Sequence, residues 1–475
     1  MTTARKWVAG IFLIAITLAC SLSGKQTSTP IVFPTPKNLF PSRTPGPSPT
    51  YDPKAAGSST PFLAHTPTPT HLNWPPPYWG SPGPTQITPI PTPAMPVNQS
   101  DSITFLFIGS DKFTSSFRTD SLILANFQPD HKLFTLMSIP RDLYVYIPGW
   151  RMQRINAAYY HGELGYYPGK GPALIKDTIL YNFGIKVDHI AMVDFDGFTQ
   201  VIDTLGGIDV PVACQYTDWK VKDPEEDLQD EDNWYLHTVK PGVVHMNGEY
   251  ALWYARSRLK STDYDRSRRQ QEVIRAIYKK ALALKMITRI PQLWEDFNEM
   301  VFTDAKLTDI IPLSVHAFDL PSASIRSFYM SPAEAPAWIS PEGAYYMLPQ
   351  PGPLQELIHK AFSPPGAEEA TNPAYVVEVW NGTPYSYWAD LAAERLSYGG
   401  FDSQVNPADK RNYKTSILYD FTFEQDSRRS DTLLAMLGLN RSNLFSDPNP
   451  ESVFPYRLIL GEDYDPCFNP NKIDR

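Results

Sequence analysis

The stretch "DHIAMVDFDGFTQVIDTLGG", residues 188–207, decides the fold class of this chain. Residues 188–195 are short and mainly apolar, which is typical of a buried strand. Residues 196–207 have apolar residues at helical spacing, with Asp196 as the predicted N-cap and two glycines as a stop. A strand followed directly by a helix is the repeating unit of α/β proteins. We therefore expect an α/β domain around this stretch.

Segments upstream of this stretch show the same alternation. Three apolar runs predict buried strands: "ITFLFIGSD" at 103–111, "DSLILANFQ" at 120–128 and "LFTLMSIPRD" at 133–142. The turn-like "PDHK" separates the last two runs. Residues 171–184 have an amphipathic pattern that ends in glycine, which predicts a helix. We place this layered α/β domain at residues 99–330.

A second, smaller domain is expected near the C-terminus. Proline-rich connectors occur in residues 331–372, which we interpret as a linker. "YVVEVWNGT" then predicts a strand and a turn, and "YWADLAAERLSYGG" predicts a helix. Because "FDSQV" and "SILYDF" suggest further strands, residues 373–465 are predicted as a small α+β domain.

The first hundred residues predict no packed domain, since they hold 20 of the 47 prolines. In residues 1–20, two basic residues precede an apolar run and then Cys20, the order of a signal peptide with a lipoprotein processing site. An uncleaved anchor and ordinary secretion remain alternatives. Residues 21–98 favour extended polyproline II and are interpreted as a tether. We expect an extracytoplasmic protein of the cell envelope, anchored to the membrane through this N-terminal segment.

Charge and cysteine content narrow the functional classes. A formal net charge of -9 and a pI near 5.5 argue against nucleic-acid binding, which usually needs a broadly basic domain. Cys214 and Cys467 are the two cysteines besides Cys20. In an oxidising compartment they are candidates for a disulfide that ties the C-terminal tail to the central domain, and two unpaired buried thiols are an equally open alternative.

Cations are concentrated in "YARSRLKSTDYDRSRRQQ", residues 254–271. If a helix begins near Arg266, the apolar stripe that starts at Val273 continues backwards to Arg266, Arg269 and Gln270 and places them on the inward face. Four other residues are then predicted to face solvent: Arg268, Gln271, Arg275 and Lys279. Arginines that point inward at a helix N-terminus suit a phosphate group.

Just upstream of this helix, Arg256 and Arg258 are predicted at the end of a strand, where residues two apart face the same side. Both side chains are then able to reach one site. Pairing of these arginines with Asp263, Asp265 and other local carboxylates is an equally open interpretation.

Carboxylates and arginines also lie at the ends of the predicted strands, where ligand sites collect in open α/β sheets. They are Asp111, Arg118, Asp120, Arg141 and Asp142. Two carboxylates from adjoining loops suit Mg²⁺, which takes one or two protein carboxylates plus phosphate oxygens. Asp111 and Asp120 are therefore the candidate metal ligands, although each aspartate taken singly is also typical of a turn or a helix cap.

From Asp101 to about residue 283, the chain resembles the LytR-CpsA-Psr (LCP) proteins. The resemblance rests on "FLFIGSD", "RTDSLILA", "TLMSIPRDLYVYIPG", "RINAAY", "VDHIAMVDFDGFTQVIDTLGGIDVPV", "MNGEYALWYARSR" and "DYDRSRRQQEVI", in the family's order. Residues 375–418, with "VEVWNGT", "LAAERL" and "GGF", resemble more weakly the C-terminal domain of LytR-type proteins.

The resemblance implies a phosphotransferase that moves a glycopolymer from a polyprenyl-pyrophosphate carrier to a hydroxyl of peptidoglycan, with Mg²⁺ as cofactor. It implies an α-β-α sandwich with an apolar pocket for the lipid tail. By position, Asp111 and Asp120 match the metal ligands, and Asp142 matches a residue that orients Arg141. The residues around the pyrophosphate are then Arg118, Arg141, Arg256, Arg258, Arg266, Arg269 and Gln270.

Two other functions use the same residues. A Mg²⁺-dependent pyrophosphatase acting on polyprenyl pyrophosphates needs the same site with water as acceptor. A non-catalytic protein that binds the lipid carrier or a wall polymer is the alternative outside the enzymes. An acidic segment at residues 220–233, predicted as an exposed insertion, is a departure from the family pattern.

Overall fold

The computed structural model describes residues 91–467, apart from 100, 111–118, 224–226, 228, 260–261, 285–300, 307, 310–319, 321–323, 364–375 and 424–427. The predicted signal segment 1–20, most of the predicted tether, and the candidate residues Asp111 and Arg118 lie outside the described residues. Within the described ranges, the helices are all too short or too polar to cross a lipid bilayer.

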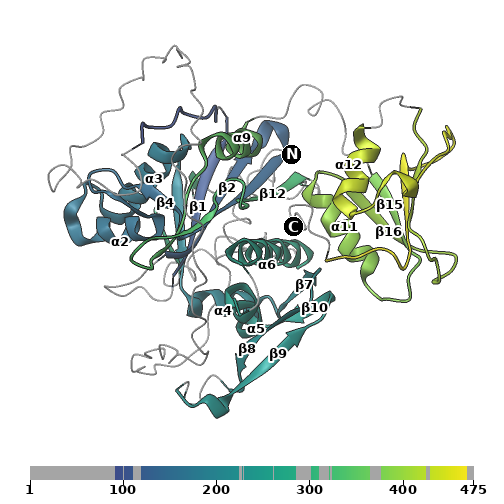
Figure 1. Cartoon of the computed structure of the whole chain (residues 1–475), viewed down its shortest axis with the longest axis horizontal. Helices are drawn as coiled ribbons and strands as arrows, with labels where there is room; N and C mark the ends of the chain where they lie inside the picture. Colours follow the sequence, from purple (N-terminus) through teal and green to yellow (C-terminus); the bar gives the residue numbers. More distant parts are fainter. Residues whose placement is uncertain are drawn as a thin grey trace, which may run out of the picture.

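A six-stranded mixed sheet forms the centre of the first domain (Figure 1). Its strand order is β11-β6-β1-β2-β3-β12. The strands are Ile103–Ser110 (β1), Thr119–Gln128 (β2), Leu133–Ile139 (β3), His189–Val193 (β6), Val301–Thr303 (β11) and Ile325–Tyr329 (β12). β2 runs antiparallel to β1 and β3, while β6 pairs in parallel with β1. The strands predicted from the four apolar runs are therefore confirmed.

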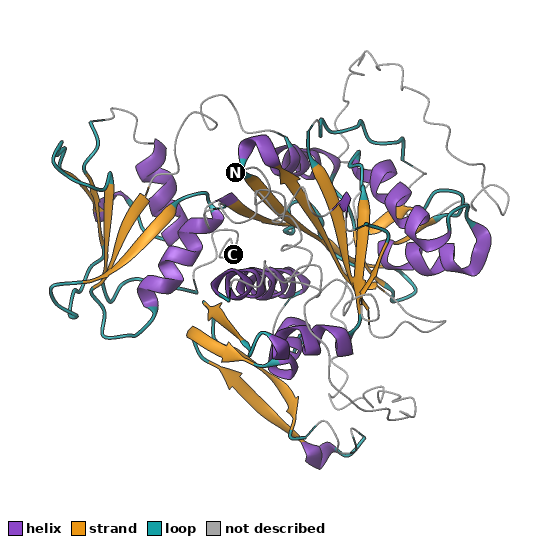
Figure 2. Ribbon diagram, turned by 180° about the vertical axis from the view of Figure 1, so that it is seen from behind, coloured by secondary structure: helices purple, strands orange, loops and turns teal. Residues whose placement is uncertain are grey.

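Helices cover both faces of this sheet (Figure 2). Phe105 and Phe107 of β1 join one core with α4 (Phe195–Thr204), α5 (Gly248–Arg256) and α6 (Asp263–Ala283). Leu106 and Ile108 join the opposite core with α2 (Ala158–His161), α3 (Lys170–Phe183) and α9 (Pro351–Phe362). Strands buried on both faces need a continuous apolar run, which β1 has. The predicted α-β-α sandwich is confirmed.

The predicted linker at 331–372 contains ordered structure in its described part. Ala337–Ile339 (β13) pairs with Tyr345–Met347 (β14), and Met347 and the apolar face of α9 pack into the core that contains α3. The Gln128 side chain also donates a hydrogen bond of 3.1 Å to the Phe362 carbonyl. These residues therefore extend the first domain to at least the end of α9.

Two helix assignments from the sequence need correction. The N-cap of α4 is Asp194, whose side chain accepts a hydrogen bond from the Gly197 N–H, and not Asp196. Arg256 is the last residue of helix α5, capped at its start by Asn247, and does not end a strand. The rule that strand residues two apart face the same side therefore does not apply to Arg256 and Arg258.

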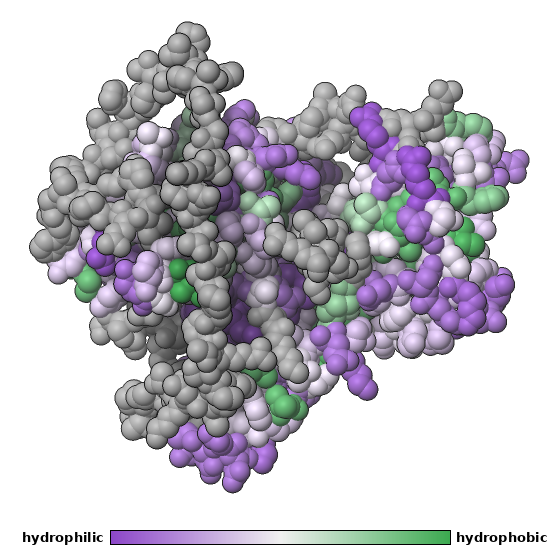
Figure 3. Space-filling view, in the orientation of Figure 1, coloured by the Kyte–Doolittle hydropathy of each residue, from purple (hydrophilic) through white to green (hydrophobic). Residues whose placement is uncertain are grey.

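Paired strands extend from α4 and α5 away from the main sheet. Ile208–Val212 (β7) pairs with Gly242–Met246 (β10), and Tyr216–Val221 (β8) pairs with Trp234–Val239 (β9). The described residues at the tip of the β8–β9 hairpin include exposed acidic side chains at 230–232, and this end of the molecule is hydrophilic in Figure 3. The predicted acidic insertion is thus an exposed hairpin tip in its described part.

The second domain has a five-stranded sheet in the order β16-β15-β19-β17-β18. Its strands are Val376–Asn381 (β15), Asp402–Pro407 (β16), Ile417–Asp420 (β17), Leu444–Ser446 (β18) and Tyr456–Leu460 (β19). Trp388–Tyr398 (α11) and Arg428–Leu437 (α12) pack on it through a separate apolar core. The predicted small domain of helices and strands near the C-terminus is present.

Helix α6 of the first domain also contacts the second domain, where its polar side chains meet α11 (Figure 1). Arg275 of α6 is only 1% exposed and donates to Glu394 at 2.9 Å and to the Ser397 hydroxyl at 2.6 Å. Gln271 is also buried, and its amide donates to the Phe328 carbonyl at 2.7 Å. The prediction that Gln271 and Arg275 face solvent was therefore wrong, while Lys279 is exposed as predicted.

Cys214 and Cys467 form a disulfide that joins the β7–β8 connection to the C-terminal tail across 253 residues. Of the two alternatives left open by the sequence, the structure contains the bridge. Because a cross-link over so long a loop restricts the unfolded chain, we expect reduction to lower the free energy of unfolding by about 2–5 kcal/mol. Denaturant unfolding with and without reductant measures this loss.

The control for the reductant is the double variant C214S/C467S. Its unfolding midpoint should match that of the reduced wild-type protein and should not respond to reductant. An unchanged midpoint after complete reduction of the wild-type protein would show that the bridge contributes nothing to stability.

Candidate functional site

Charged side chains from separate segments meet near the end of β3. Arg141, two residues after β3, places Nη1 2.5 Å from Asp120 Oδ1 on β2. Its Nε lies 3.4 Å from Asp142 Oδ2. Asp142 is also 3.6 Å from Nε of Arg154, the last residue of Met152–Arg154 (β5). The structure therefore contains the predicted ion pair between Asp142 and Arg141.

A second pair of arginines shares one carboxylate at the start of α6. Asp263 Oδ1 lies 3.0 Å from Arg266 Nη2 and 3.3 Å from Arg258 Nη1. The charge of Asp263 also acts to raise the pKa of Arg141, and the charge of Asp120 acts to raise the pKa of Arg266. The two pairs therefore form a single electrostatic cluster. We call it the arginine–aspartate cluster: Asp120, Arg141, Asp142, Arg154, Arg258, Asp263 and Arg266.

Arg266 has the most unusual environment in the arginine–aspartate cluster. It is 6% exposed, and burial lowers the pKa of its guanidinium to about 10, against the opposing effect of Asp263 and with help from Arg258 and Arg141. Its Nε is buried without a hydrogen-bond partner among the described residues. Because a desolvated cation with an unused donor is costly, this side chain suits a bound anion.

The position of Arg266 in α6 adds to this effect. The helix begins at Asp263, and the N-cap Thr262 accepts a hydrogen bond from the Asp265 N–H through its side chain. Arg266 therefore lies in the first turn, where free N–H groups and the helix dipole favour negative charge. The sequence prediction that a helix begins near Arg266 is confirmed.

Arg141 is held as a permanent cation. Burial acts to lower its pKa, but Asp120 and Asp142 outweigh burial, and the pKa of Arg141 is raised overall. The ion pairs also fix the direction of the guanidinium, because Nη1 and Nε each have a carboxylate partner. Arg141 therefore presents a fixed positive charge beside Arg266.

Asp120 is the one predicted metal ligand that the structure describes. Its side chain is 33% exposed, and a carboxylate oxygen is the type of donor that Mg²⁺ prefers. Among the described residues, three or more His, Cys, Asp or Glu side chains do not come together in a metal-binding arrangement. Asp120 fits Mg²⁺ in its chemistry, and the metal site remains a prediction that also requires Asp111 and phosphate oxygens.

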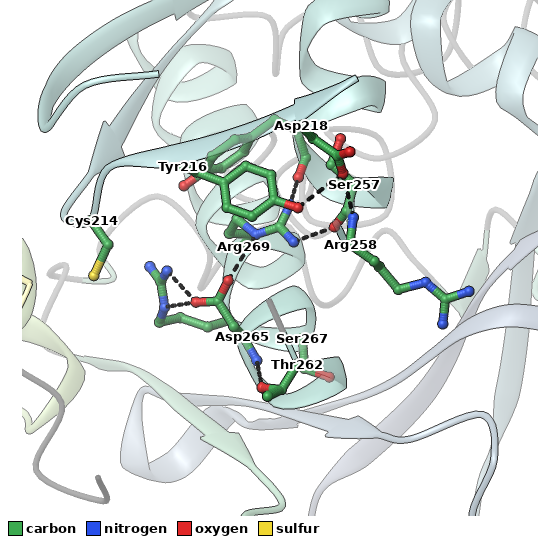
Figure 4. A network of polar contacts seen from close by, with 12 residues as sticks. Cys214, Tyr216, Asp218, Ser257, Arg258, Thr262, Asp265, Ser267 and Arg269 are labelled. Atoms are coloured by element: carbon green, nitrogen blue, oxygen red, sulfur yellow. Dashed lines mark hydrogen bonds and ion pairs between the residues drawn. The ribbon is translucent and has the colours of Figure 1, made fainter. Parts of the chain in front are cut away.

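Arg269 is turned away from the arginine–aspartate cluster. It is 0% exposed, its Nη2 donates to the Ser257 carbonyl at 2.5 Å, and its Nη1 donates to the Tyr254 carbonyl (Figure 4). Its Nε donates to Asp265 at 3.3 Å, and the guanidinium stacks on the Tyr216 ring. The structure thus places Arg269 where it holds the C-terminus of α5, and not with Arg141, Arg258 and Arg266.

Two more predicted pyrophosphate contacts lie outside the arginine–aspartate cluster. Gln270 donates to the Ala255 carbonyl at 3.4 Å. Arg256 is exposed, with its guanidinium 3.9 Å from the centre of the Phe195 ring. Of the predicted phosphate-binding residues that the structure describes, Arg141, Arg258 and Arg266 are brought together, while Arg256, Arg269 and Gln270 are not.

Sequence reasoning missed Arg154 as a member of the cluster, although "RINAAY" was among the family-like motifs and begins with it. It weighed Asp263 and Asp265 only as local partners of the arginines. The predicted pairing with local carboxylates is confirmed, because Asp263 pairs with Arg258 and Arg266, and Asp265 pairs with Arg269. A carboxylate that pairs with two arginines can orient them for a ligand.

Comparisons with known proteins agree with the resemblance. The chain matches the family model described as the LytR_cpsA_psr family over residues 85–360. It is 30% identical over 260 residues to the polyisoprenyl-teichoic acid–peptidoglycan teichoic acid transferase TagV of Bacillus subtilis (strain 168), covering 53% of this chain and 62% of that protein. It is 32% identical over 199 residues to the regulatory protein MsrR of Staphylococcus aureus (strain COL), covering 42% of this chain and 54% of that protein.

Among solved structures, the crystal structure of B. subtilis TagV aligns with a TM-score of 0.45 and 27% identity, covering 56% of this chain and 99% of that chain. The chain spans less than two thirds of the length of each curated relative named above. The family model, in contrast, matches more than half of this chain and includes the whole arginine–aspartate cluster. The chain therefore belongs to the LytR_cpsA_psr family.

Proposed function

We propose that this protein is a phosphotransferase that moves a glycopolymer from a polyprenyl-pyrophosphate carrier to a hydroxyl of peptidoglycan. The observation that carries the proposal is the convergence of Arg141, Arg258 and buried Arg266 on one cluster, with Arg266 Nε unpartnered among the described residues. The name of the relative TagV, a polyisoprenyl-teichoic acid–peptidoglycan teichoic acid transferase, supports the same substrate classes.

The charges of the arginine–aspartate cluster fit a pyrophosphate. The cluster contains four arginines and three aspartates among the described residues, so its positive charges outnumber its negative charges. In the proposed reaction, the acceptor hydroxyl attacks the phosphorus that carries the glycan, and the bond to the bridging oxygen breaks. A phosphodiester forms, the proton of the acceptor hydroxyl passes to solvent, and polyprenyl phosphate leaves with additional negative charge. Fixed guanidinium groups stabilise that charge, which is the main contribution expected in phosphoryl transfer.

We further propose that Asp111 and Asp120 hold Mg²⁺, which would neutralise phosphate charge when bound. Asp111→Ala is expected to lower the transfer rate by at least about 100-fold and to abolish its dependence on Mg²⁺. Initial rates over a Mg²⁺ titration measure both effects. The exposed Asp130→Ala, in the turn after β2, is the matched control and should keep the wild-type Mg²⁺ dependence. An Asp111→Ala protein with the wild-type Mg²⁺ response would contradict the assignment.

A transfer assay tests the function itself. The full chain is incubated with a labelled glycan on polyprenyl pyrophosphate, Mg²⁺ and peptidoglycan fragments. The proposal requires a glycan–peptidoglycan conjugate together with polyprenyl monophosphate. Hydrolysis that releases the labelled glycan phosphate, without any conjugate, favours the pyrophosphatase alternative. Binding of the lipid-linked glycan without any product favours the non-catalytic alternative.

The predicted location belongs to the same proposal. A transferase that uses peptidoglycan and a membrane-embedded carrier must work outside the cytoplasm and close to the membrane. Residues 1–20 and the tether 21–98 supply an export signal, a candidate lipidation site at Cys20 and enough reach. Metabolic labelling of the protein with a fatty acid, lost in a Cys20→Ala variant, tests the lipoprotein anchor.

A further inference from the structure

Asp218 on β8 is a buried carboxylate next to the arginine–aspartate cluster. Its Oδ2 accepts hydrogen bonds from the backbone N–H groups of Arg258 at 2.6 Å and Leu259 at 3.0 Å. The Tyr216 hydroxyl donates to the same oxygen at 3.0 Å, and the Trp219 N–H donates to Oδ1 at 2.7 Å. A buried carboxylate is costly unless its oxygens are hydrogen-bonded, and here both are.

The backbone that Asp218 binds is the connection between α5 and α6. Directly before this connection, the Arg269 guanidinium donates to the carbonyls of Tyr254, in the last turn of α5, and Ser257, its C-cap. One acidic side chain thus holds N–H groups and one basic side chain holds carbonyls in the same short segment (Figure 4). Such charge-assisted bonds are stronger than neutral ones, so the segment is fixed from both sides.

Arg258 is the member of the arginine–aspartate cluster that this segment carries. Its side chain is 44% exposed and extends away from Arg269 and Asp218 (Figure 4), and its Nη1 reaches Asp263 at 3.3 Å. A long, half-exposed side chain with a single weak ion pair is poorly fixed by its own contacts. The position of its backbone therefore decides where the guanidinium lies.

We propose that Asp218 is a positioning residue for the anion site: by binding the N–H groups of Arg258 and Leu259, it directs the Arg258 guanidinium to the arginine–aspartate cluster. The inference rests on the proposed function, because it takes the anion to be the pyrophosphate of the donor. Asp218 acts through Arg258 and does not itself touch the ligand. Asp218 lies on the β8–β9 hairpin, 40 residues before Arg258 in the sequence, so the hairpin contributes to the geometry of the anion site.

A double-mutant cycle on the full chain tests this inference with inorganic pyrophosphate as the probe, measured by titration calorimetry at a fixed Mg²⁺ concentration. Asp218→Ala and Arg258→Ala are each expected to weaken binding about tenfold, the usual effect of losing one charged hydrogen-bonding group. The double variant should bind no more weakly than Arg258→Ala alone, because Asp218 acts only through Arg258. Asp218→Asn, which keeps one accepting oxygen, should fall between wild type and Asp218→Ala.

Tyr216→Phe is the matched control, since it removes one hydrogen bond from the same carboxylate and keeps the ring under Arg269. Its affinity should stay within about threefold of wild type. Additive losses in the cycle, or unchanged affinity in Asp218→Ala, overturn the inference while leaving the proposed function intact. A wild-type chain that binds no pyrophosphate overturns both. If Asp218→Ala does not fold, Asp218→Asn and its double variant with Arg258→Ala decide the question in the same way.

Discussion

Arg266→Ala is expected to lower kcat/KM for glycan transfer by about 10²–10³-fold, which corresponds to roughly 3–4 kcal/mol of lost transition-state stabilisation. The reason is the desolvated position of Arg266. Its pKa is lowered to about 10, so it stays cationic at neutral pH, and its Nε has no partner among the described residues. In the proposed reaction, the alanine variant removes this charge from the place where negative charge develops on the leaving phosphate. Steady-state rates with a labelled lipid-linked glycan measure the loss.

The fold is expected to survive Arg266→Ala, because Asp263 keeps its second partner Arg258. Arg266→Lys should recover only part of the activity, since a lysine supplies a point charge without the planar fork of donors. Arg441→Ala, at an exposed arginine of the second domain, is the matched control and should have wild-type kinetics. Normal turnover by a folded Arg266→Ala protein would remove the basis of the proposed function.

Helix α6 shows what the sequence pattern could predict and what it could not. The apolar stripe through Val273 and Ile277 was predicted from its spacing and is buried against the main sheet. The same spacing wrongly placed Arg275 at the surface, because its partner Glu394 lies 119 residues further along the chain. Periodicity identifies an apolar face, but it contains no information about a polar face that another domain later covers.

The candidate site shows a similar division. Asp120, Arg141 and Arg266 were predicted because charged residues at strand ends and helix starts have a recognisable position in the sequence. The role of Arg269 in holding the end of α5 was not predictable, since the two partners there are backbone carbonyls, which every residue type provides. Asp218 was missed because it lies two residues before an acidic segment interpreted as an exposed insertion, whereas in the structure it is buried.

Glu394→Gln is expected to lower the free energy of unfolding by about 3–5 kcal/mol at neutral pH, because it leaves Arg275 buried without its anion. Glu394 lies between the two domains, 2.9 Å from Arg275 Nε and also paired with Lys279. Burial alone would raise its pKa, but Arg275 and Lys279 reverse this effect and lower the pKa to about 2. Urea unfolding at several pH values measures the contribution.

The sign of the pH dependence follows from that lowered pKa. Because the folded state holds Glu394 ionised below its ordinary value of 4.5, its contribution is complete above about pH 4.5 and is lost as the pH falls toward 2. The difference in stability between wild type and Glu394→Gln should therefore shrink over this range. Glu462→Gln, which breaks an exposed pair with Lys414, is the control and should cost at most about 1 kcal/mol. If both variants lose the same small amount at neutral pH, the ion pair between α6 and α11 does not hold the domains together, and the other contacts of α11 with β7, β10 and β12 must be more important.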